Sequence, residues 1–402
     1  MTTTADLFDL DLFADGPPHD LFRRLRAEAP VCFLPEPDGP GYWGVFDYEH
    51  VVEVSRHPLQ YGSHPNTMIQ DADDGDGGAG ALMLNQDPPR HTQLRKLVNR
   101  GFTPKRVGDL KAGVRTRIDA LIDGLAGATS CDLVTDVALW LPLHVIADMV
   151  GVPESDRRQV FEWTEMTFGF DPAVTPEQRA EAAIAMYGYA DAMCEERRDH
   201  PRDDLISVLM AADVDGEALT QMQIDLFFLL LQNAGSETTR NLITSGMLAL
   251  IDHPRELQRL RDDLSLLPVA IEELLRYVTP VISFCRTAAV DTTVGEQPIR
   301  AGDRLLMVYA SANRDERAFD APDRLDLTRT RNDHVAFGAG GPHFCLGASL
   351  ARLESKEMFE ALLTRFDGLE VDADVDALPR VNSVLIDGFA HLPVRWKSIR
   401  AA

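Results

Sequence analysis

Apolar and polar residues follow two different periods along the chain. Two short apolar runs, Val31–Leu34 and Tyr42–Phe46, flank a turn rich in proline, aspartate and glycine. Two more, Val384–Ile386 and Phe389–Leu392, flank an Asp-Gly pair, so each pair of runs predicts a β-hairpin. From Pro104 to about Pro268 the spacing of apolar residues is mostly helical, and Pro and Gly mark the breaks. We therefore expect a mainly α fold with small β-sheets.

The 402 residues contain no internal repeat and no linker, so a single domain spanning residues 1–402 is expected. Inside it, residues 71–80 read DADDGDGGAG, a polar and glycine-rich break that predicts a mobile acidic loop. The first twenty residues carry Asp6, Asp9, Asp11 and Asp15 where a secretory leader needs positive charge and an apolar run, so no export signal is expected.

The longest predicted helix lies in the middle of the chain. Thr220 and Gln223 form a T-x-x-Q capping box, in which each side chain satisfies the other's free backbone amide. The helical pattern continues to Asp252, just before His253-Pro254. About 33 residues at 1.5 Å per residue give a helix of roughly 50 Å, which would cross the whole protein.

The centre of this helix, residues 234–239, reads AGSETT and departs from the composition of a core helix. A glycine costs a helix interior about 1 kcal/mol, and a buried acid or hydroxyl costs more unless it is hydrogen-bonded. The Thr238 hydroxyl can donate to the carbonyl of Ala234, which bends the helix and opens a groove. A surface-exposed turn of an amphipathic helix is the alternative. The apolar flanks Leu226–Leu231 and Met247–Ile251 favour a buried centre.

A second unusual segment, residues 337–347, reads FGAGGPHFCLG and precedes a helical pattern over residues 348–363. Its three glycines before Cys345 allow the backbone to approach a flat, bulky group closely. Cys345 lies at a helix start, where the macrodipole favours thiolate over thiol. A lone thiolate in such a loop suits a metal that is held mainly by another group.

Three other interpretations compete for this loop. A phosphate loop fails because there is no Gly-Lys-Ser/Thr and no preceding Rossmann pattern. A Cys–His hydrolase is a weak interpretation, because His343 is only two residues away and is expected to point elsewhere. A buried structural cysteine stays open but leaves the glycines unexplained.

Charge and cysteine usage narrow the classes of function. The chain has 39 Lys or Arg and 64 Asp or Glu, a net charge of −25, which argues against nucleic acid as the partner. The five cysteines are scattered without zinc-ligand spacing or a disulfide framework, which fits a reducing cytoplasm. The most apolar run, Leu226–Leu231, lies in an uncharged window that ends at Glu237, short of the roughly 20 residues that span a membrane. We expect a soluble, cytoplasmic protein without stable membrane insertion.

Together these segments resemble a bacterial cytochrome P450, a haem-thiolate monooxygenase. Residues 337–347 are similar to the haem-binding loop, and residues 234–239 to the oxygen-activating motif of the central helix. Glu273 and Arg276 match the Glu-x-x-Arg motif, and Arg324 fits the third member of that ion-pair cluster. The resemblance implies a triangular helical fold with the long central helix over the haem, and a buried, structural role for the ion pairs.

The loop departs from the family pattern in length. Phe337 and Cys345 are eight positions apart, whereas the usual spacing is seven, and the extra residue falls among Ala339, Gly340 and Gly341. Similar lengthened loops occur in actinobacterial sterol side-chain and methyl-branched lipid hydroxylases.

The resemblance assigns roles to individual residues. Cys345 is implied as the axial thiolate of haem b, where it would push electron density onto the iron. Thr238 would hold the iron-bound oxygen and relay protons that Glu237 supplies from solvent; a structural ion-pair partner is the alternative for Glu237. The residues expected at the haem are Cys345, His91, Arg95, Arg286, His343, Phe337, Gly347 and Ala234. Of these, His91, Arg95, Arg286 and His343 are expected to bind the propionates.

The window from Arg90 to Arg106 holds six Lys or Arg and no acid, a local reversal on an acidic chain. Cations that the propionates do not use are expected to face an acidic ferredoxin, with a ferredoxin reductase behind it; a solvated basic helix face is the alternative. A monomer is the default for the family.

Apolar segments around the haem are expected to contact the substrate. By position these segments are Ala81–Leu84, the stretch near Phe168–Phe170, Val281–Phe284 and Val384–Ile386. Val281, Ile282 and Phe284 are the individual residues selected. Because these segments carry no charged anchor, a bulky apolar substrate is expected.

The expected reaction is hydroxylation of an unactivated C–H of a sterol, branched lipid or terpenoid with O2 and two electrons. The lengthened loop and the spelling GSETTRN at residues 235–241 favour sterol or branched lipid. Two alternatives share the fold: a peroxygenase that uses hydrogen peroxide, and a non-catalytic haem-binding module.

Overall fold

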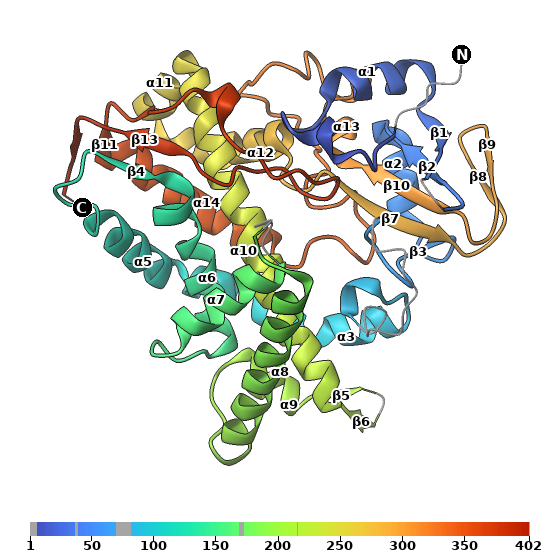
Figure 1. Cartoon of the computed structure of the whole chain (residues 1–402), viewed down its shortest axis with the longest axis horizontal. Coiled ribbons are helices and arrows are strands. Elements are labelled where there is room, and N and C mark those ends of the chain that lie inside the picture. The colour runs from blue at the N-terminus through green and yellow to red at the C-terminus, as the bar shows by residue number, and fades with distance from the viewer. Residues whose placement is uncertain (1–5, 37–38, 70–81, 169–172, 215, 402) are drawn as a thin grey trace.

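The computed structural model describes residues 6–36, 39–69, 82–168, 173–214 and 216–401 (Figure 1). The predicted loop at residues 71–80 and the predicted contact Ala81 lie outside the described residues, as do most of the residues near Phe168–Phe170.

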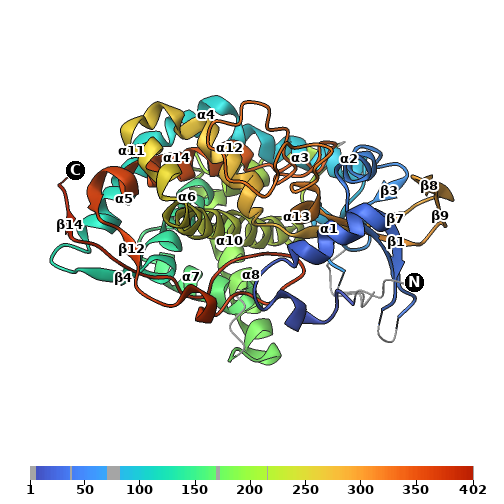
Figure 2. The same cartoon turned by 90° about the horizontal axis from the view of Figure 1, so that it is seen from above.

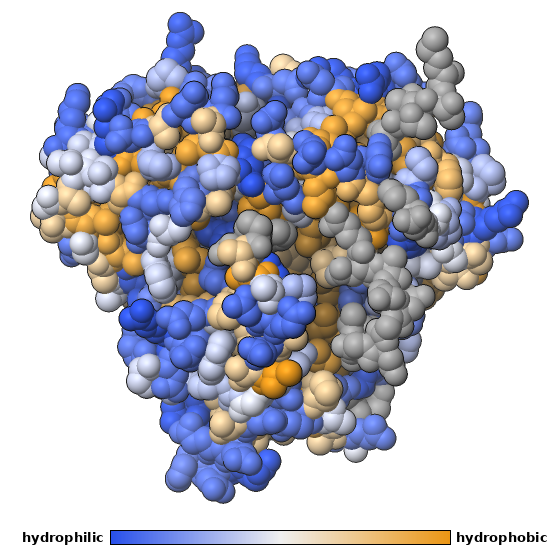
Figure 3. All heavy atoms as spheres, viewed as in Figure 1, coloured by the Kyte–Doolittle hydropathy of each residue, from blue (hydrophilic) through white to orange (hydrophobic). Residues whose placement is uncertain are grey.

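The chain is mainly helical with small sheets, as the sequence predicts. The longer helices are α1 (His19–Glu28), α2 (Tyr48–Arg56), α3 (Arg90–Val98), α5 (Lys111–Asp123), α6 (Trp140–Val150), α7 (Arg157–Phe168), α8 (Pro176–Asp199), α10 (Gln221–Asp252), α11 (Pro254–Asp262), α12 (Leu267–Val278) and α14 (Ala348–Arg365). Shorter helices are α4 (Pro104–Asp109), α9 (Leu205–Met210) and α13 (Tyr309–Ala312). Figures 1 and 3 show a triangular outline that narrows toward α8, α9 and the β5–β6 pair (Asp213–Val214 and Glu217–Ala218).

Helix α10 is the central element of this fold. The predicted capping box is present, because Thr220 accepts from the backbone of Gln223 and the Gln223 side chain accepts from the backbone of Thr220. The helix crosses the molecule and contacts α6, α8, α12 and α14 (Figures 1 and 2). Gly235 allows the close approach to α6, since a Cβ there would lie 2.5 Å from Ile146 Cγ1.

A five-stranded sheet lies at the end of the molecule that holds the N-terminus (Figure 1). Its order is β1 (Val31–Leu34), β2 (Tyr42–Val45), β10 (Arg304–Val308), β7 (Ser283–Ala288) and β3 (Tyr61–Gly62). β1 and β2 pair antiparallel, which confirms the first predicted hairpin, whereas β2 and β10 pair parallel. A three-stranded sheet has the order β12 (Glu370–Val371), β13 (Pro393–Arg395) and β4 (Ser130–Asp132). Two further strand pairs are β8 (Thr292–Val294) with β9 (Gln297–Ile299), and β11 (Phe366–Asp367) with β14 (Ser398–Ile399).

The prediction of a second hairpin, between Val384–Ile386 and Phe389–Leu392, is wrong. Phe389 pairs with Arg380, and the segment 384–386 lies in the intervening loop. There Ile386 bridges to Val281, and the Leu385 carbonyl accepts from Ile282 N at 2.8 Å. The Ser383 hydroxyl accepts from the amides of Leu385 and Ile386, which satisfies the turn locally and leaves this segment free to pair with residues 281–282.

The segment Leu133–Val150, a π-helical turn followed by α6, is long and apolar enough to cross a membrane by length and composition. Within the fold 61% of it is buried, as is usual for a core helix. This segment is therefore weak evidence for a membrane span, and the drawn surface is mostly hydrophilic (Figure 3).

Candidate active site

The Cys345 loop is closed by its own backbone and by α2. The amide of Cys345 donates to the Phe337 carbonyl at 2.9 Å. Gly338, Gly340 and Gly341 have φ of +88°, +94° and +76°, a region that favours glycine. A Cβ on Gly341 would also lie 2.3 Å from the Ser55 carbonyl. The three glycines thus have a role within the chain itself, beyond the approach of a flat group that the sequence suggests.

The extra loop residue rests on the last turn of α2. The Ser55 hydroxyl donates to the Gly340 carbonyl at 3.0 Å, and Arg56 Nε donates to the Ala339 carbonyl at 3.2 Å. These two bonds satisfy carbonyls in the part of the loop that holds the extra residue, so α2 supports the lengthened segment ahead of Cys345.

Cys345 is half-buried, and its thiol needs a positive charge nearby in order to ionise. Burial raises its pKa, and the amides of Gly347 and Ala348 together with Arg95 and Arg352 only partly oppose that effect. The helix start alone therefore does not produce the thiolate that the sequence predicts. Among the described residues there is no cluster of three or more His, Cys, Asp or Glu side chains for a metal. A metal at Cys345 must be held mostly by a non-protein ligand, as iron is in haem, and its charge would stabilise the thiolate.

All four predicted propionate ligands lie beside this loop. The rings of His91, on α3, and His343 stack at 3.9 Å, and the guanidiniums of Arg95 and Arg286 act on both. Burial first, then these arginines, lowers the pKa of His91 to about 4 and of His343 to about 2, so both rings are neutral. His91 Nδ1 is buried without a hydrogen-bond partner, so the cluster suits carboxylates such as propionates.

Phe337 and Gly347 flank the cysteine. The Phe337 ring packs under the Arg352 guanidinium at 4.6 Å from the ring centroid. Gly347 has a φ of −82°, and a Cβ there would meet nothing within 4 Å. Neither conformation nor crowding within the chain requires glycine at this position, which fits contact with a flat cofactor.

On α10, the face that carries Ala234 and Thr238 is open, although the helix is otherwise mostly buried. Thr238 Oγ1 donates to the Ala234 carbonyl at 3.2 Å, as predicted. Ser236, Glu237 and Thr239 are buried, so the centre of the helix is not a surface turn. The hydroxyl is therefore presented on an open strip of a core helix.

Glu237 is buried and paired loosely. Its carboxylate lies 3.4 Å from Arg240 Nη2, and Arg240 Nη1 lies 3.5 Å from Glu165 of α7. Burial raises the pKa of Glu237 to about 7, with Arg240 opposing and Glu165 reinforcing the shift. The carboxyl can therefore hold or release a proton near neutral pH. Sequence reasoning missed Arg240, although its i, i+3 spacing from Glu237 signals it, and Glu165, for which no sequence signal exists.

The Glu-x-x-Arg cluster is present, but its third member is Arg329. Arg276 Nε and Nη2 each donate to Glu273 at 2.8 Å, and Arg329 Nε donates to Glu273 at 3.0 Å. The predicted member, Arg324, has a side chain that is 69% exposed and pairs with Asp326; only its carbonyl accepts from Arg276. The prediction that Arg324 is the third member is wrong, because spacing along an irregular segment does not tell which arginine side chain points into the protein.

The predicted substrate residues do not form one surface. Ile282 is buried in a core cluster with Leu306 and Phe22, so it is not available to a ligand. Val281 and Phe284 are half-buried and stay candidates.

Comparisons with known proteins agree with this arrangement. The family model for cytochrome P450 matches residues 143–389. The steroid C26-monooxygenase of Rhodococcus jostii is 38% identical over 98% of this chain and 85% of the relative. The methyl-branched lipid omega-hydroxylase of Mycobacterium tuberculosis is 38% identical over 97% of this chain and 94% of the relative. A solved structure of a Mycobacterium marinum cytochrome P450 in complex with pseudoionone is 36% identical, with a TM-score of 0.89 over 94% of each chain. Since the family model covers more than half of the residues and the relatives nearly all of them, the chain belongs to the cytochrome P450 family.

Proposed function

We propose that this P450 monooxygenase hydroxylates an unactivated C–H of a sterol or methyl-branched lipid. The observation that carries a monooxygenase role is the pairing on α10 of an open Thr238 hydroxyl with the buried, protonatable Glu237. A peroxygenase or a non-catalytic haem module needs no such pair. The lipid class is supported by two relatives named for steroid and methyl-branched lipid oxidation, and by the apolar side chains of Val281 and Phe284.

The cofactor is haem with cysteine thiolate ligation, and Cys345 is the residue that we assign to the iron. His91, Arg95, Arg286 and His343 would hold the propionates. When bound, the haem supplies the activation of O2. Thr238 would hold a proton on Oγ1 at the open face of α10, and Glu237 would return one to it from the side of α7.

The redox partner that we propose is an acidic ferredoxin with its reductase, acting on a cytoplasmic monomer. Lys96, Arg100 and Lys105 are exposed and support this docking, whereas Arg106 pairs with Asp203 and is removed from the set. Weaker electron transfer at higher salt would support a charge-guided encounter.

An optical titration of the purified ferric protein tests the substrate class. Sterols, methyl-branched fatty acids and monoterpenoids are added separately, and the Soret band is followed for the shift toward high spin. Saturation by one lipid class at low concentration supports the proposal; a haem spectrum that responds to none of them contradicts it. The variant Cys345→His should abolish the thiolate-type spectrum, and a surviving spectrum would show that the axial assignment is wrong.

Turnover with the ligand that binds separates the reaction types. Product that requires the ferredoxin pair, NAD(P)H and O2 supports a monooxygenase. Product formed equally well from hydrogen peroxide without the pair would identify a peroxygenase, and no product under either condition a binding module.

A further inference from the structure

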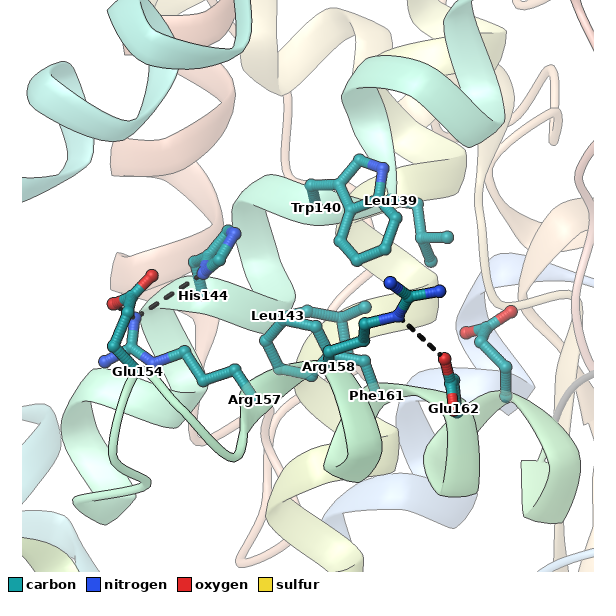
Figure 4. Close-up of a pocket in the computed structure, with 10 residues that line it drawn as sticks. Leu139, Trp140, Leu143, His144, Glu154, Arg157, Arg158, Phe161 and Glu162 are labelled. Atoms are coloured by element: carbon teal, nitrogen blue, oxygen red, sulfur yellow. Dashed lines mark hydrogen bonds and ion pairs between the residues drawn. The ribbon is translucent and has the colours of Figure 1, made fainter.

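A pocket of about 570 Å³ lies between α6 and α7, outside the groups that we assign to the haem (Figure 4). Its apolar lining includes Trp140, Leu143 and Phe161, and charged side chains line it as well. Most of those charges pair with one another: Arg158 with Glu162, and Arg157 with Glu154. His144 also contacts Arg157. Glu165 lines the same pocket but is directed to α10, where it contacts Arg240.

Glu165, Arg240 and Glu237 form a continuous series of contacts from the pocket to the centre of α10. Side-chain exposure falls from 34% at Glu165 to 8% at Arg240 and 10% at Glu237. The two contacts of Arg240 measure 3.5 Å and 3.4 Å, so neither carboxylate has a close pair with it. Glu237 is followed in the chain by Thr238, whose hydroxyl lies on the open face of α10.

Arg240 is fixed in this shared position. Its Nε donates to Asn241 Oδ1 at 3.2 Å. Asn241 is itself confined, because its Cγ lies only 2.5 Å from where a Cβ on Gly388 would be. The guanidinium therefore lies between two carboxyls with one positive charge for both, and the local charge is balanced when one of the two holds a proton.

We propose that Glu165 is a positioning residue for proton uptake in this enzyme. Because Glu165 shares Arg240 with Glu237, Arg240 does not form a close ion pair with Glu237 alone. Glu237 then takes a proton from solvent onto a carboxylate oxygen. It passes that proton to the Thr238 hydroxyl oxygen as the hydroxyl releases its own proton toward the reaction site. The inference rests on the proposed function of Glu237 and Thr238.

The charge on Glu165 determines the expected direction of the effect. The charged groups that act on Glu237 are Arg240, on its own helix, and Glu165, on α7. Without the Glu165 charge, Arg240 would pair with Glu237 alone and favour its ionised form, so a lower pH would be needed to protonate it.

The variant Glu165→Gln tests this in the holoenzyme. Product formed per O2 consumed at pH 7.5 should fall about 3- to 10-fold, and the alkaline limb of the pH profile should move down by ~0.5–1 unit. Infrared pH titration of the protonated-carboxyl band, assigned as the band lost in Glu237→Gln, should show the same downward shift of its midpoint.

Glu162→Gln is the matched control, because Glu162 lines the same pocket but pairs with Arg158. It should leave the coupling ratio, the pH profile and the infrared midpoint unchanged. The carbon monoxide difference spectrum of each variant confirms that the thiolate site is intact.

Different results would overturn the proposed function of Glu237 and the proposed role of Glu165. If Glu237→Gln leaves coupling unchanged, the proposed function of Glu237 is wrong. If Glu237→Gln uncouples the enzyme but Glu165→Gln behaves like Glu162→Gln, only the role of Glu165 is wrong.

Discussion

Two regions of this molecule contain the same sequence pattern, an acid followed three residues later by an arginine on a helix. On α12, Glu273 and Arg276 are fully buried and joined by two bonds of 2.8 Å. On α10, Glu237 and Arg240 are also buried, yet a single contact of 3.4 Å joins them and Arg240 is shared with Glu165. One pattern thus gives a fixed structural pair and a loosely held, protonatable acid.

The difference comes from the groups around each pair. Arg276 also donates to the carbonyls of Asn313 and Pro322, and Glu273 accepts from Arg329, Asn332 and the amide of Asp326. All the nitrogens of the Arg276 guanidinium donate hydrogen bonds, so this buried pair is fully bonded to its surroundings. Around Glu237 there are few hydrogen-bond donors, so burial has the largest effect on its pKa. The same pairing motif therefore places a buried acid in two different environments, which differ in the number of hydrogen-bond donors.

The largest expected effect comes from breaking the α12 pair. Arg276→Ala should lower the free energy of unfolding by ~3–5 kcal/mol, because the buried Glu273 carboxylate loses its ion-pair partner and three carbonyls lose a donor. Arg240→Ala should cost less than ~1 kcal/mol, since Glu237 can keep its proton and become neutral. Denaturant unfolding of both variants measures the difference; equal losses would contradict the distinction between the two regions.

The third cation sharpens the same comparison. Arg329→Ala should destabilise the protein by ~1.5–3 kcal/mol, because the Arg329 side chain is only 9% exposed and bonds the buried Glu273. Arg324→Ala should change stability by less than ~0.5 kcal/mol, because its pair with Asp326 is exposed. The reverse order of melting temperatures would restore the sequence-based assignment.

These two arginines also show where sequence reasoning ends. Helix α10 could be predicted to its final residue, because its capping box and the following His-Pro are local signals. Cys345 and the Glu273–Arg276 pair follow from local motifs in the same way. Arg329, Glu165 and the pairing of Ile386 with Val281 depend on how distant segments pack, and local pattern does not contain that information.

The acid on α10 should make stability depend on pH. Its folded pKa of about 7 lies above the usual value of 4.5, so the folded state binds the proton more tightly than the unfolded state. The cost of burying Glu237 is absent below pH 4.5, grows as pH rises through 7, and is complete above it.

Glu237→Gln removes that cost, while Arg240 keeps its contact with Glu165. The variant should be more stable than the parent by ~1–3 kcal/mol at pH 8 and equal to it at pH 4.5. Unfolding at the two pH values measures the difference. A constant difference between them would mean that Glu237 does not change its protonation state between the two pH values.

Replacing Thr238 should have the smallest effect on stability but a clear effect on the coupling of O2 consumption to product. Its hydroxyl bonds the Ala234 carbonyl within the same helix, a contact that the helix does not need because that carbonyl also has its backbone partner. Thr238→Ala should therefore change the free energy of unfolding by less than ~0.5 kcal/mol. Product per O2 consumed should nevertheless fall about 3- to 10-fold, because the proton from Glu237 loses its acceptor at the open face of α10. Thr239→Ala, one residue on and buried, is the control for helix packing. Coupling retained in Thr238→Ala would remove the chemical role from this region, and the loose pairing of Glu237 would then have no function in proton transfer.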